Sequence, residues 1–180
     1  ELSTSEQVED FKSIGDEFGA YDFKWATKTE DRNRLWKARH DAYWAGKSLW
    51  PQASSLVTDC CVPISSLASC ILKTKEAIKE SNLLAPLVGH VGDGNYHLLI
   101  LFDGTTRDGL KRAKKLAGRI NEIALSFGGT ITGEHGVGTG KKNFMYLEHG
   151  KAWNLMGDIK QLFDPKNIMN PGKLVPDQNS

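Results

Sequence analysis

The chain has 180 residues, of which 39% are hydrophobic and 25% are charged, as in an ordinary globular domain with or without a terminal extension. Its 23 basic and 22 acidic residues give a net charge of +1, which argues against nucleic-acid binding because that binding needs a strongly basic face. No apolar run approaches the roughly 18–20 residues that a membrane-spanning helix needs.

The three cysteines are Cys60, Cys61 and Cys70. Adjacent cysteines have poor geometry for a mutual disulfide, and no C-x-x-C pair is present. We therefore predict three reduced and mostly buried thiols, as in a cytosolic type of compartment.

In the first half of the chain, the spacing of apolar residues predicts alternating helices and strands. Residues 5–18 and 29–44 have the helical period, whereas residues 20–26 alternate aromatic and polar side chains as a strand does. A second strand is predicted over residues 56–64, and an amphipathic helix over residues 65–80.

In the second half, two strands are predicted within residues 84–102, on either side of a Gly-Asp-Gly-Asn turn. A long basic helix over residues 107–127 ends at two glycines, a short strand follows at 130–132, and a helix covers 151–163. These elements predict an α+β fold with a largely antiparallel sheet, packed helices and a C-terminal helical tail.

The segment HVGDGNYH, residues 90–97, is the most informative part of the sequence. If Asp93-Gly94 forms a two-residue hairpin loop, His90 and His97 face each other with Cβ atoms about 4.5–5.5 Å apart. Two imidazoles so placed can chelate one divalent ion. The alternative is a pair of hydrogen-bonded core histidines, and the density of nearby glycines favours the site because glycine permits close backbone approach.

The segment GEHG, residues 133–136, offers a carboxylate and an imidazole between glycines. Glu134 would complete a set of two histidines and one carboxylate, which leaves coordination positions open for a substrate. His135 would then remain free to act as a general base. A phosphate-binding loop of the G-x-x-x-x-G-K-[ST] type is not matched here.

Taken together, HVGDGNYH, TGEHGVGTGKK and FDPKNIMNPGK resemble the C-terminal part of the flavin-linked oxidases related to vanillyl-alcohol oxidase. Within that group the chain is most similar to the flavin-containing, cytochrome-linked D-lactate dehydrogenases, alongside glycolate oxidase D-subunits and D-2-hydroxyglutarate dehydrogenases. The resemblance extends from the helix that contains LWKARH, residues 35–40, to Lys173.

The resemblance implies a role for several residues. His90, His97 and Glu134 match the family's divalent metal ligands, for which Zn, Mn or Fe is expected. His135 matches the base that takes the proton of the substrate hydroxyl.

It also implies contacts to the substrate and the flavin. Arg39 matches an arginine that clamps the substrate carboxylate, which suits a planar bidentate guanidinium; the alternative is an ordinary arginine on a helix surface. Asn95 and Asn170 match positions where the family approaches its flavin or substrate, and we expect them to be cofactor-binding.

The implied protein is larger than this chain. Residues 1–180 are expected to form the substrate (cap) domain, with the family's N-terminal FAD-binding domain and a first strand of the cap lying outside it. Expected partners are a small 2-hydroxy acid, the protein's own FAD domain, and an electron acceptor that is a quinone, a cytochrome or an electron-transfer flavoprotein. A homodimer is compatible with this picture. The expected location is cytoplasmic, or mitochondrial in a eukaryote, with peripheral contact at the inner membrane.

The implied reaction oxidises D-lactate or a similar short 2-hydroxy acid to the 2-oxo acid by hydride transfer to FAD, and the isolated fragment is expected to be inactive. Val57 and Leu99 stand where the 2-hydroxyglutarate enzymes carry a lysine and an asparagine, which favours a short substrate unless Lys47 supplies the charge. Alternatives are a metal-binding module without redox activity, a glycolate or D-2-hydroxyglutarate dehydrogenase, and a metal-dependent hydrolase with Glu134 as base.

Overall fold

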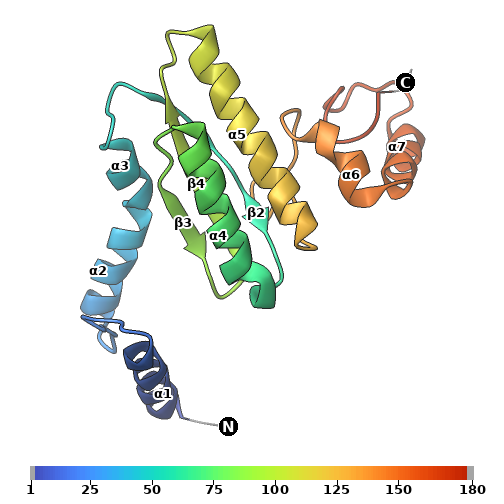
Figure 1. Cartoon of the computed structure of the whole chain (residues 1–180). Helices are drawn as coiled ribbons and strands as arrows, with labels where there is room; N and C mark the ends of the chain where they lie inside the picture. Colours follow the sequence, from blue (N-terminus) through green and yellow to red (C-terminus); the bar gives the residue numbers. More distant parts are fainter. Residues whose placement is uncertain (1–2, 178–180) are drawn as a thin grey trace. The chain divides into compact units, whose positions relative to one another are not determined.

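The computed structural model describes residues 3–177, and these form two compact units, the first ending at Trp44 and the second beginning at Ala45 (Figure 1). The first unit contains α1 (Thr4–Glu17) and α2 (Thr29–His40). Ser3 begins α1 with a capping box, in which its hydroxyl accepts from Glu6 N and the Glu6 carboxylate accepts from Ser3 N. α1 confirms the predicted helix over residues 5–18, and α2 covers the first part of the helix predicted over residues 29–44.

The strand predicted over residues 20–26 is wrong, because this segment contains no strand. Asp22 has φ +55°, which interrupts any extended run, and Phe23 packs on Phe11 of α1 with ring centroids 5.8 Å apart. The aromatic residues of this segment therefore contribute to a helix–loop contact. The predicted helix 29–44 is also divided, since α2 ends at His40 and α3 (Ala42–Lys47) follows.

A small antiparallel sheet organises the second unit around its central strand, β4 (Asn95–Phe102). β1 (Ser54–Val57) and β2 (Cys60–Cys61) pair with β4 in one continuous register, and β3 (Leu87–His90) pairs with its other edge. The single strand predicted over 56–64 is interrupted between β1 and β2, where the Thr58 hydroxyl accepts from Leu98 N at 2.9 Å.

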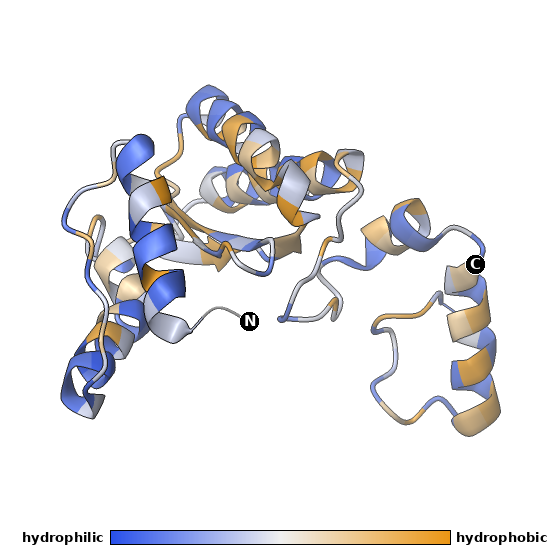
Figure 2. Cartoon of the chain, turned by 90° about the horizontal axis from the view of Figure 1, so that it is seen from below, coloured by the Kyte–Doolittle hydropathy of each residue, from blue (hydrophilic) through white to orange (hydrophobic). Residues whose placement is uncertain are grey.

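Two helices, α4 (Ile64–Ser81) and α5 (Arg107–Ser126), cover one face of this sheet (Figure 1). Tyr96, Leu98 and Ile100 alternate along β4 and are buried against the helices, and Figure 2 shows hydrophobic residues along the strands and on nearby helix faces. The alternate residues Asn95, His97 and Leu99 therefore point to the opposite face. This opposite face carries the polar side chains of Asn95 and His97 at one end of β4 and a second apolar cluster, with Leu99 and Leu101, at the other.

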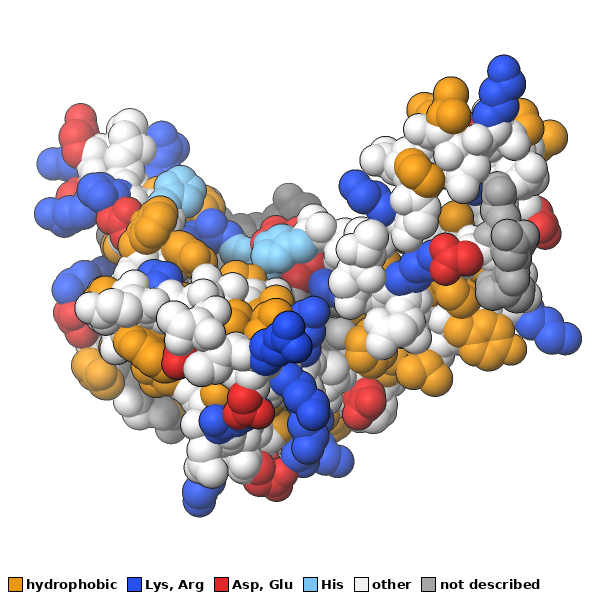
Figure 3. Space-filling view, turned by 90° about the horizontal axis from the view of Figure 1, so that it is seen from above, with side chains coloured by type: hydrophobic (Ala, Val, Ile, Leu, Met, Phe, Trp, Pro, Cys, Tyr) orange, Lys and Arg blue, Asp and Glu red, His pale blue; other side chains and the backbone are white. Residues whose placement is uncertain are grey.

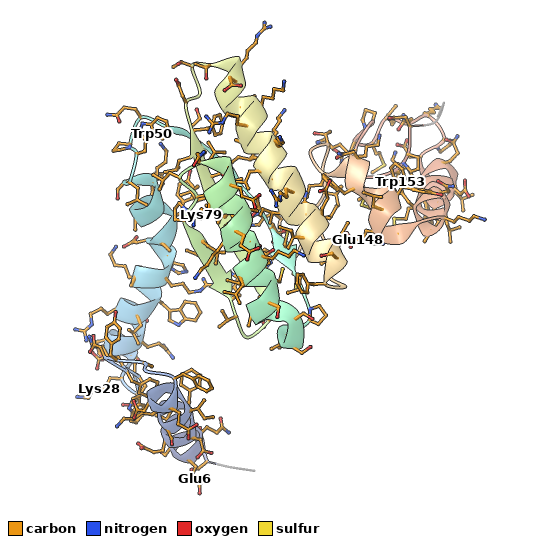
Figure 4. The ribbon with its side chains drawn as sticks, viewed as in Figure 1. Glu6, Lys28, Trp50, Lys79, Glu148 and Trp153 are labelled. Carbon is orange, nitrogen blue, oxygen red and sulfur yellow. The ribbon has the colours of Figure 1, made fainter. Side chains whose placement is uncertain are left out.

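The C-terminal part contains a 3-10 turn (Lys142–Phe144), α6 (Met145–His149) and α7 (Ala152–Phe163). α6 was not predicted; its residue Glu148, labelled in Figure 4, accepts a hydrogen bond from Ile131 N at 3.1 Å. Asp164, which follows α7, accepts from Ile168 N and Met169 N and so shapes the tail.

The α+β prediction is confirmed. Cys60 and Cys70 are buried and Cys61 is half-buried, and all three are free thiols as predicted. None of the described helices combines the length and apolar character needed to cross a membrane.

Candidate metal and substrate site

The hairpin between β3 and β4 brings the first two predicted ligands together, but not by the predicted turn. His90 pairs with Asn95 across a four-residue loop, in which Asp93 N donates to His90 O at 2.9 Å. A type I′ turn needs positive φ at both central residues, and of Asp93 and Gly94 only Gly94 (φ +75°) has it. The predicted His90–His97 pairing is therefore wrong by two residues. Because a shift of two preserves the face, both histidines still point the same way.

His90, His97 and Glu134 converge on one point. Glu134 Oε1 lies 3.2 Å from His97 Nε2 and 3.6 Å from His90 Nε2, and the donor atoms of all three residues lie within 4.8 Å of one another. Two imidazoles and one carboxylate are a donor set that suits a divalent transition metal and leaves coordination positions open. The residues present therefore fit the ion that the sequence predicts.

The buried side chain of His97 is oriented from the neighbouring strand. Its Nδ1 lies 3.0 Å from the carbonyl oxygen of Thr58, which can only accept, so Nδ1 carries the proton. Nε2 is therefore the ring nitrogen that a neutral His97 would offer to a metal ion, on the side of Glu134. A carbonyl that fixes the tautomer of a metal-ligating histidine is a common arrangement around metal sites.

His135 lies beside this cluster with its ring accessible. The ring stacks on that of His97, with centroids 4.9 Å apart and planes 14° apart, and His135 Nε2 is 3.5 Å from Glu134 Oε1. Its side chain is 46% exposed, so a ligand at the cluster can reach it. Figure 3 shows histidine side chains at the surface beside acidic ones.

Asp59 is the residue of this site that the sequence analysis missed. It is fully buried, and its Oδ2 accepts from Thr132 Oγ1 and from the backbone N–H groups of Gly133, Glu134 and His135 at 2.8–3.0 Å. Burial alone would raise the pKa of Asp59, but these hydrogen bonds outweigh it and hold the pKa well below its usual range. The sequence signal was an acidic residue within an apolar strand, which is rarely buried without partners.

Asp59, His97 and His135 also form a compact group of donor atoms. However, Asp59 Oδ2 already accepts four hydrogen bonds and Oδ1 accepts a fifth from Asn95 Nδ2 at 2.9 Å. This carboxylate has little capacity left for a cation, and we assign it to hold the protein backbone.

Asn95 has a structural contact and one free acceptor. Its amide nitrogen donates to Asp59 Oδ1 and to Cys60 O at 3.0 Å, and because both partners are acceptors the orientation of the amide is fixed. Its Oδ1 is buried and has no partner among residues 3–177. Such an atom suits a hydrogen-bond donor of a water or ligand, and a cofactor contact stays a prediction.

The other two predicted site residues lie elsewhere in the chain. Arg39 belongs to α2 of the first unit, where its guanidinium lies over the Trp36 ring at 5.1 Å. Asn170, with φ +49°, lines a pocket of about 300 Å³ together with residues of α7, and His90, His97, Glu134 and His135 do not line it. Their assigned roles stay predictions.

Val57 and Leu99 are paired directly across β1 and β4, and each lies two residues along the chain from a residue of the site, Asp59 or His97. Leu99 is buried and Val57 is exposed. The ammonium group of Lys47 donates to the carbonyl groups of Pro51 and Ala53. That engagement weighs against Lys47 as a substrate-binding charge.

The fold and the site define an α+β domain that presents two histidines of an antiparallel sheet and a carboxylate of a nearby loop on the sheet face opposite α4 and α5. Residues 1–174 match the family model described as FAD linked oxidases, C-terminal domain, and the chain belongs to this family.

Among curated relatives, a probable mitochondrial D-lactate dehydrogenase of Danio rerio is 44% identical over 96% of this chain and 35% of its own length. A mitochondrial, cytochrome-type D-lactate dehydrogenase of Arabidopsis thaliana is 41% identical over 98% of this chain and 31% of its own length. The glycolate oxidase subunit GlcD of Escherichia coli is 32% identical over 96% of this chain and 35% of its length. The chain thus spans about a third of the length of these relatives.

Proposed function

We propose that this chain is the substrate-binding part of an FAD-dependent, metal-assisted dehydrogenase that oxidises D-lactate or a similar short D-2-hydroxy acid to the 2-oxo acid. The observation that carries the proposal is the convergence of His90, His97 and Glu134, with His135 accessible beside them. The names of the relatives support the choice of substrate class.

The proposed roles follow from the contacts. His90 Nε2, His97 Nε2 and Glu134 Oε1 would hold a divalent ion, which would polarise the hydroxyl and carboxylate of the substrate, while FAD supplies the hydride acceptor. His135 takes the hydroxyl proton at its imidazole, which is accessible and stacked on His97. Arg39 binds the substrate carboxylate, and Asn95 and Asn170 approach the flavin.

The pairing of Val57 with Leu99 supports a short substrate. A dicarboxylate such as D-2-hydroxyglutarate would bring a second charge, and leaving a charge buried and unpaired costs several kcal/mol. An apolar pair beside the cluster instead suits a short aliphatic tail. The hydrolase alternative is less well supported, because Glu134 Oε1 faces two imidazole nitrogens and is placed as a ligand rather than as a free base.

The rest of the proposal concerns the longer protein. We propose that an N-terminal FAD-binding domain precedes this cap domain and that the reduced flavin passes electrons to a quinone, a cytochrome or an electron-transfer flavoprotein. In a eukaryote we propose a mitochondrial location, which the names of two relatives support. Peripheral contact with the inner membrane and a homodimer stay predictions.

The test compares the full-length protein with a double histidine variant and uses D-lactate as the substrate. Anaerobic D-lactate should bleach the visible flavin absorption, and the His90→Ala, His97→Ala double variant should keep its flavin, lose about one bound ion per chain and lose the bleaching. Equal metal content in the two proteins, or unchanged bleaching, would contradict the proposal.

A further inference from the structure

The loop that carries Glu134 and His135 is wrapped around a single buried atom, Asp59 Oδ2. Three consecutive backbone N–H groups, of Gly133, Glu134 and His135, point to this oxygen at 2.9, 3.0 and 2.8 Å, and the Thr132 hydroxyl joins them at 2.8 Å. Successive N–H groups that converge in this way form an anion-binding nest. Here the anion is part of the protein itself.

We propose that Asp59 is the positioning residue of the metal site, which fixes the backbone of residues 132–135 so that Glu134 meets His90 and His97. The proposal rests on the proposed function, because it concerns the site that would hold the metal. Asp59 itself would not bind the ion, since both of its oxygens are already used by hydrogen bonds.

The loop depends on this carboxylate because its geometry is otherwise unfavourable. A buried N–H without an acceptor costs about 1–3 kcal/mol, and three of them would point at the same place. The glycines beside Glu134 and His135 allow the loop to adopt this conformation. Gly136 has φ +77°, and a Cβ added to Gly133 would lie 2.1 Å from Asn95 Nδ2. The glycines on either side of Glu134 and His135 therefore belong to a loop with a defined conformation.

Glu134 has little else to hold it in place. Its side chain is 53% exposed, yet Oε1 lies within 3.6 Å of nitrogen atoms from β3 and β4. The anchor for this side chain is its own backbone, and Glu134 N is bound by Asp59. Removing the carboxylate of Asp59 should therefore release Glu134 and His135 before it affects His90 and His97.

Two adjacent residues orient ligands from different parts of the chain. The Thr58 carbonyl accepts from His97 Nδ1, while the Asp59 carboxylate accepts from the loop of Glu134 and His135. Lys141 completes the support, because its ammonium donates to the carbonyls of Asp59 and Ile131 and lies 3.8 Å from Asp59 Oδ2. Two of the three metal ligands, His97 and Glu134, are thus oriented by the two residues that lie between β1 and β2.

The competing explanation is that Asp59 only stabilises the fold. Asp164 provides a matched control, because it is also a buried aspartate that accepts backbone N–H groups, those of Ile168 and Met169, but it lies outside the metal group. Asp59→Asn and Asp164→Asn can therefore be compared directly. Thr132→Val is a milder second variant, since it removes one of the hydrogen bonds to Asp59 and keeps the carboxylate.

The experiment measures Zn²⁺ affinity by calorimetry and amide hydrogen exchange in the metal-free protein. Loss of support around a metal ligand typically weakens affinity by about 10–100-fold. We expect a weakening in that range for Asp59→Asn, a smaller one for Thr132→Val, and none for Asp164→Asn. Exchange at residues 133–135 should accelerate in both Asp59→Asn and Thr132→Val, whereas Asp164→Asn should accelerate exchange at residues 168 and 169.

The two readouts separate this inference from the proposed function. If the unmodified protein binds no Zn²⁺, the proposed function fails, and the exchange rates alone decide whether Asp59 holds the loop. If Zn²⁺ binds and neither Asp59→Asn nor Thr132→Val weakens it, the positioning role is refuted. If Asp59→Asn does not fold, Thr132→Val decides: weaker Zn²⁺ binding at an unchanged melting temperature supports the role, and unchanged binding and exchange overturn it.

Discussion

The substrate preference can be redirected by a single charge at Val57. Val57 is 39% exposed and pairs with buried Leu99, two residues along the chain from Asp59 and His97 respectively. In the wild-type site, a second substrate carboxylate would meet this apolar pair, and an unpaired buried charge costs several kcal/mol. Val57→Lys would place a cation beside the second carboxylate. Because residue 57 is partly exposed to solvent, this cation should offset only a fraction of the cost of the unpaired charge.

We expect full-length Val57→Lys to raise kcat/KM for D-2-hydroxyglutarate, relative to D-lactate, by at least about tenfold, or ~1.4 kcal/mol. The unmodified enzyme should favour D-lactate by at least about the same factor. Leu72→Lys is the matched control, because Leu72 is an exposed residue of α4 and the charge is added on the helical side of the sheet. Steady-state kinetics with both acids measures the ratio. An unchanged ratio in Val57→Lys, or an equal change in Leu72→Lys, would refute the reasoning.

Three further predictions concern stability and reactivity. The pKa of Asp59 is lowered in the folded state, so ionised Asp59 stabilises the fold above the ordinary aspartate pKa of 3.8, and this stability is lost as the pH falls below that value. Between pH 6 and pH 3 the melting temperature should therefore fall less in Asp59→Asn than in the parent protein. Parallel curves for the two proteins would contradict this. A disulfide-exchange thiol reagent should modify Cys61 first in the native protein, because Cys60 and Cys70 are buried and burial raises the pKa of Cys60 to about 12. Rapid reaction of all three thiols would contradict this. Tyr96→Phe should reduce the unfolding free energy in urea by about 1 kcal/mol, because the buried hydroxyl bonds to Cys70 and Thr74, and an unchanged value would show that these contacts contribute nothing.

The helices and the central strands were predictable because their apolar spacing is regular over many residues. β4 and α5 both lie where the sequence predicted a strand and a long helix. The segment 20–26 has an equally regular alternation of aromatic and polar residues. Such alternation leads to a strand only if another strand is available for pairing. In addition, Asp22 has φ +55°, which prevents the extended conformation. Sequence spacing carries no information about that partner.

The candidate site was predictable as a set of residue types and not as a geometry. His90 and His97 were placed on one face through a turn that does not form, and the prediction of a shared face survived because the error was two residues rather than one. Asp59 could not be assigned a role in advance, because its contacts reach across more than 70 residues to the loop after Ile131. Such long-range hydrogen bonds leave no periodic trace in the sequence.

The alternation along β4 has a consequence for how this protein can change. Tyr96, Leu98 and Ile100 fill the core, while Asn95, His97 and Leu99 serve the site, so one strand carries two functions on interleaved residues. A deletion or insertion of a single residue within β4 would exchange the two sets, placing the imidazole in the core and leucines in the site. Substitution can alter this strand one residue at a time, but its length can change only in steps of two. Changes of length are therefore expected to accumulate in the loops, and the residues 91–94 between β3 and β4 are one place where they could do so without reversing either face.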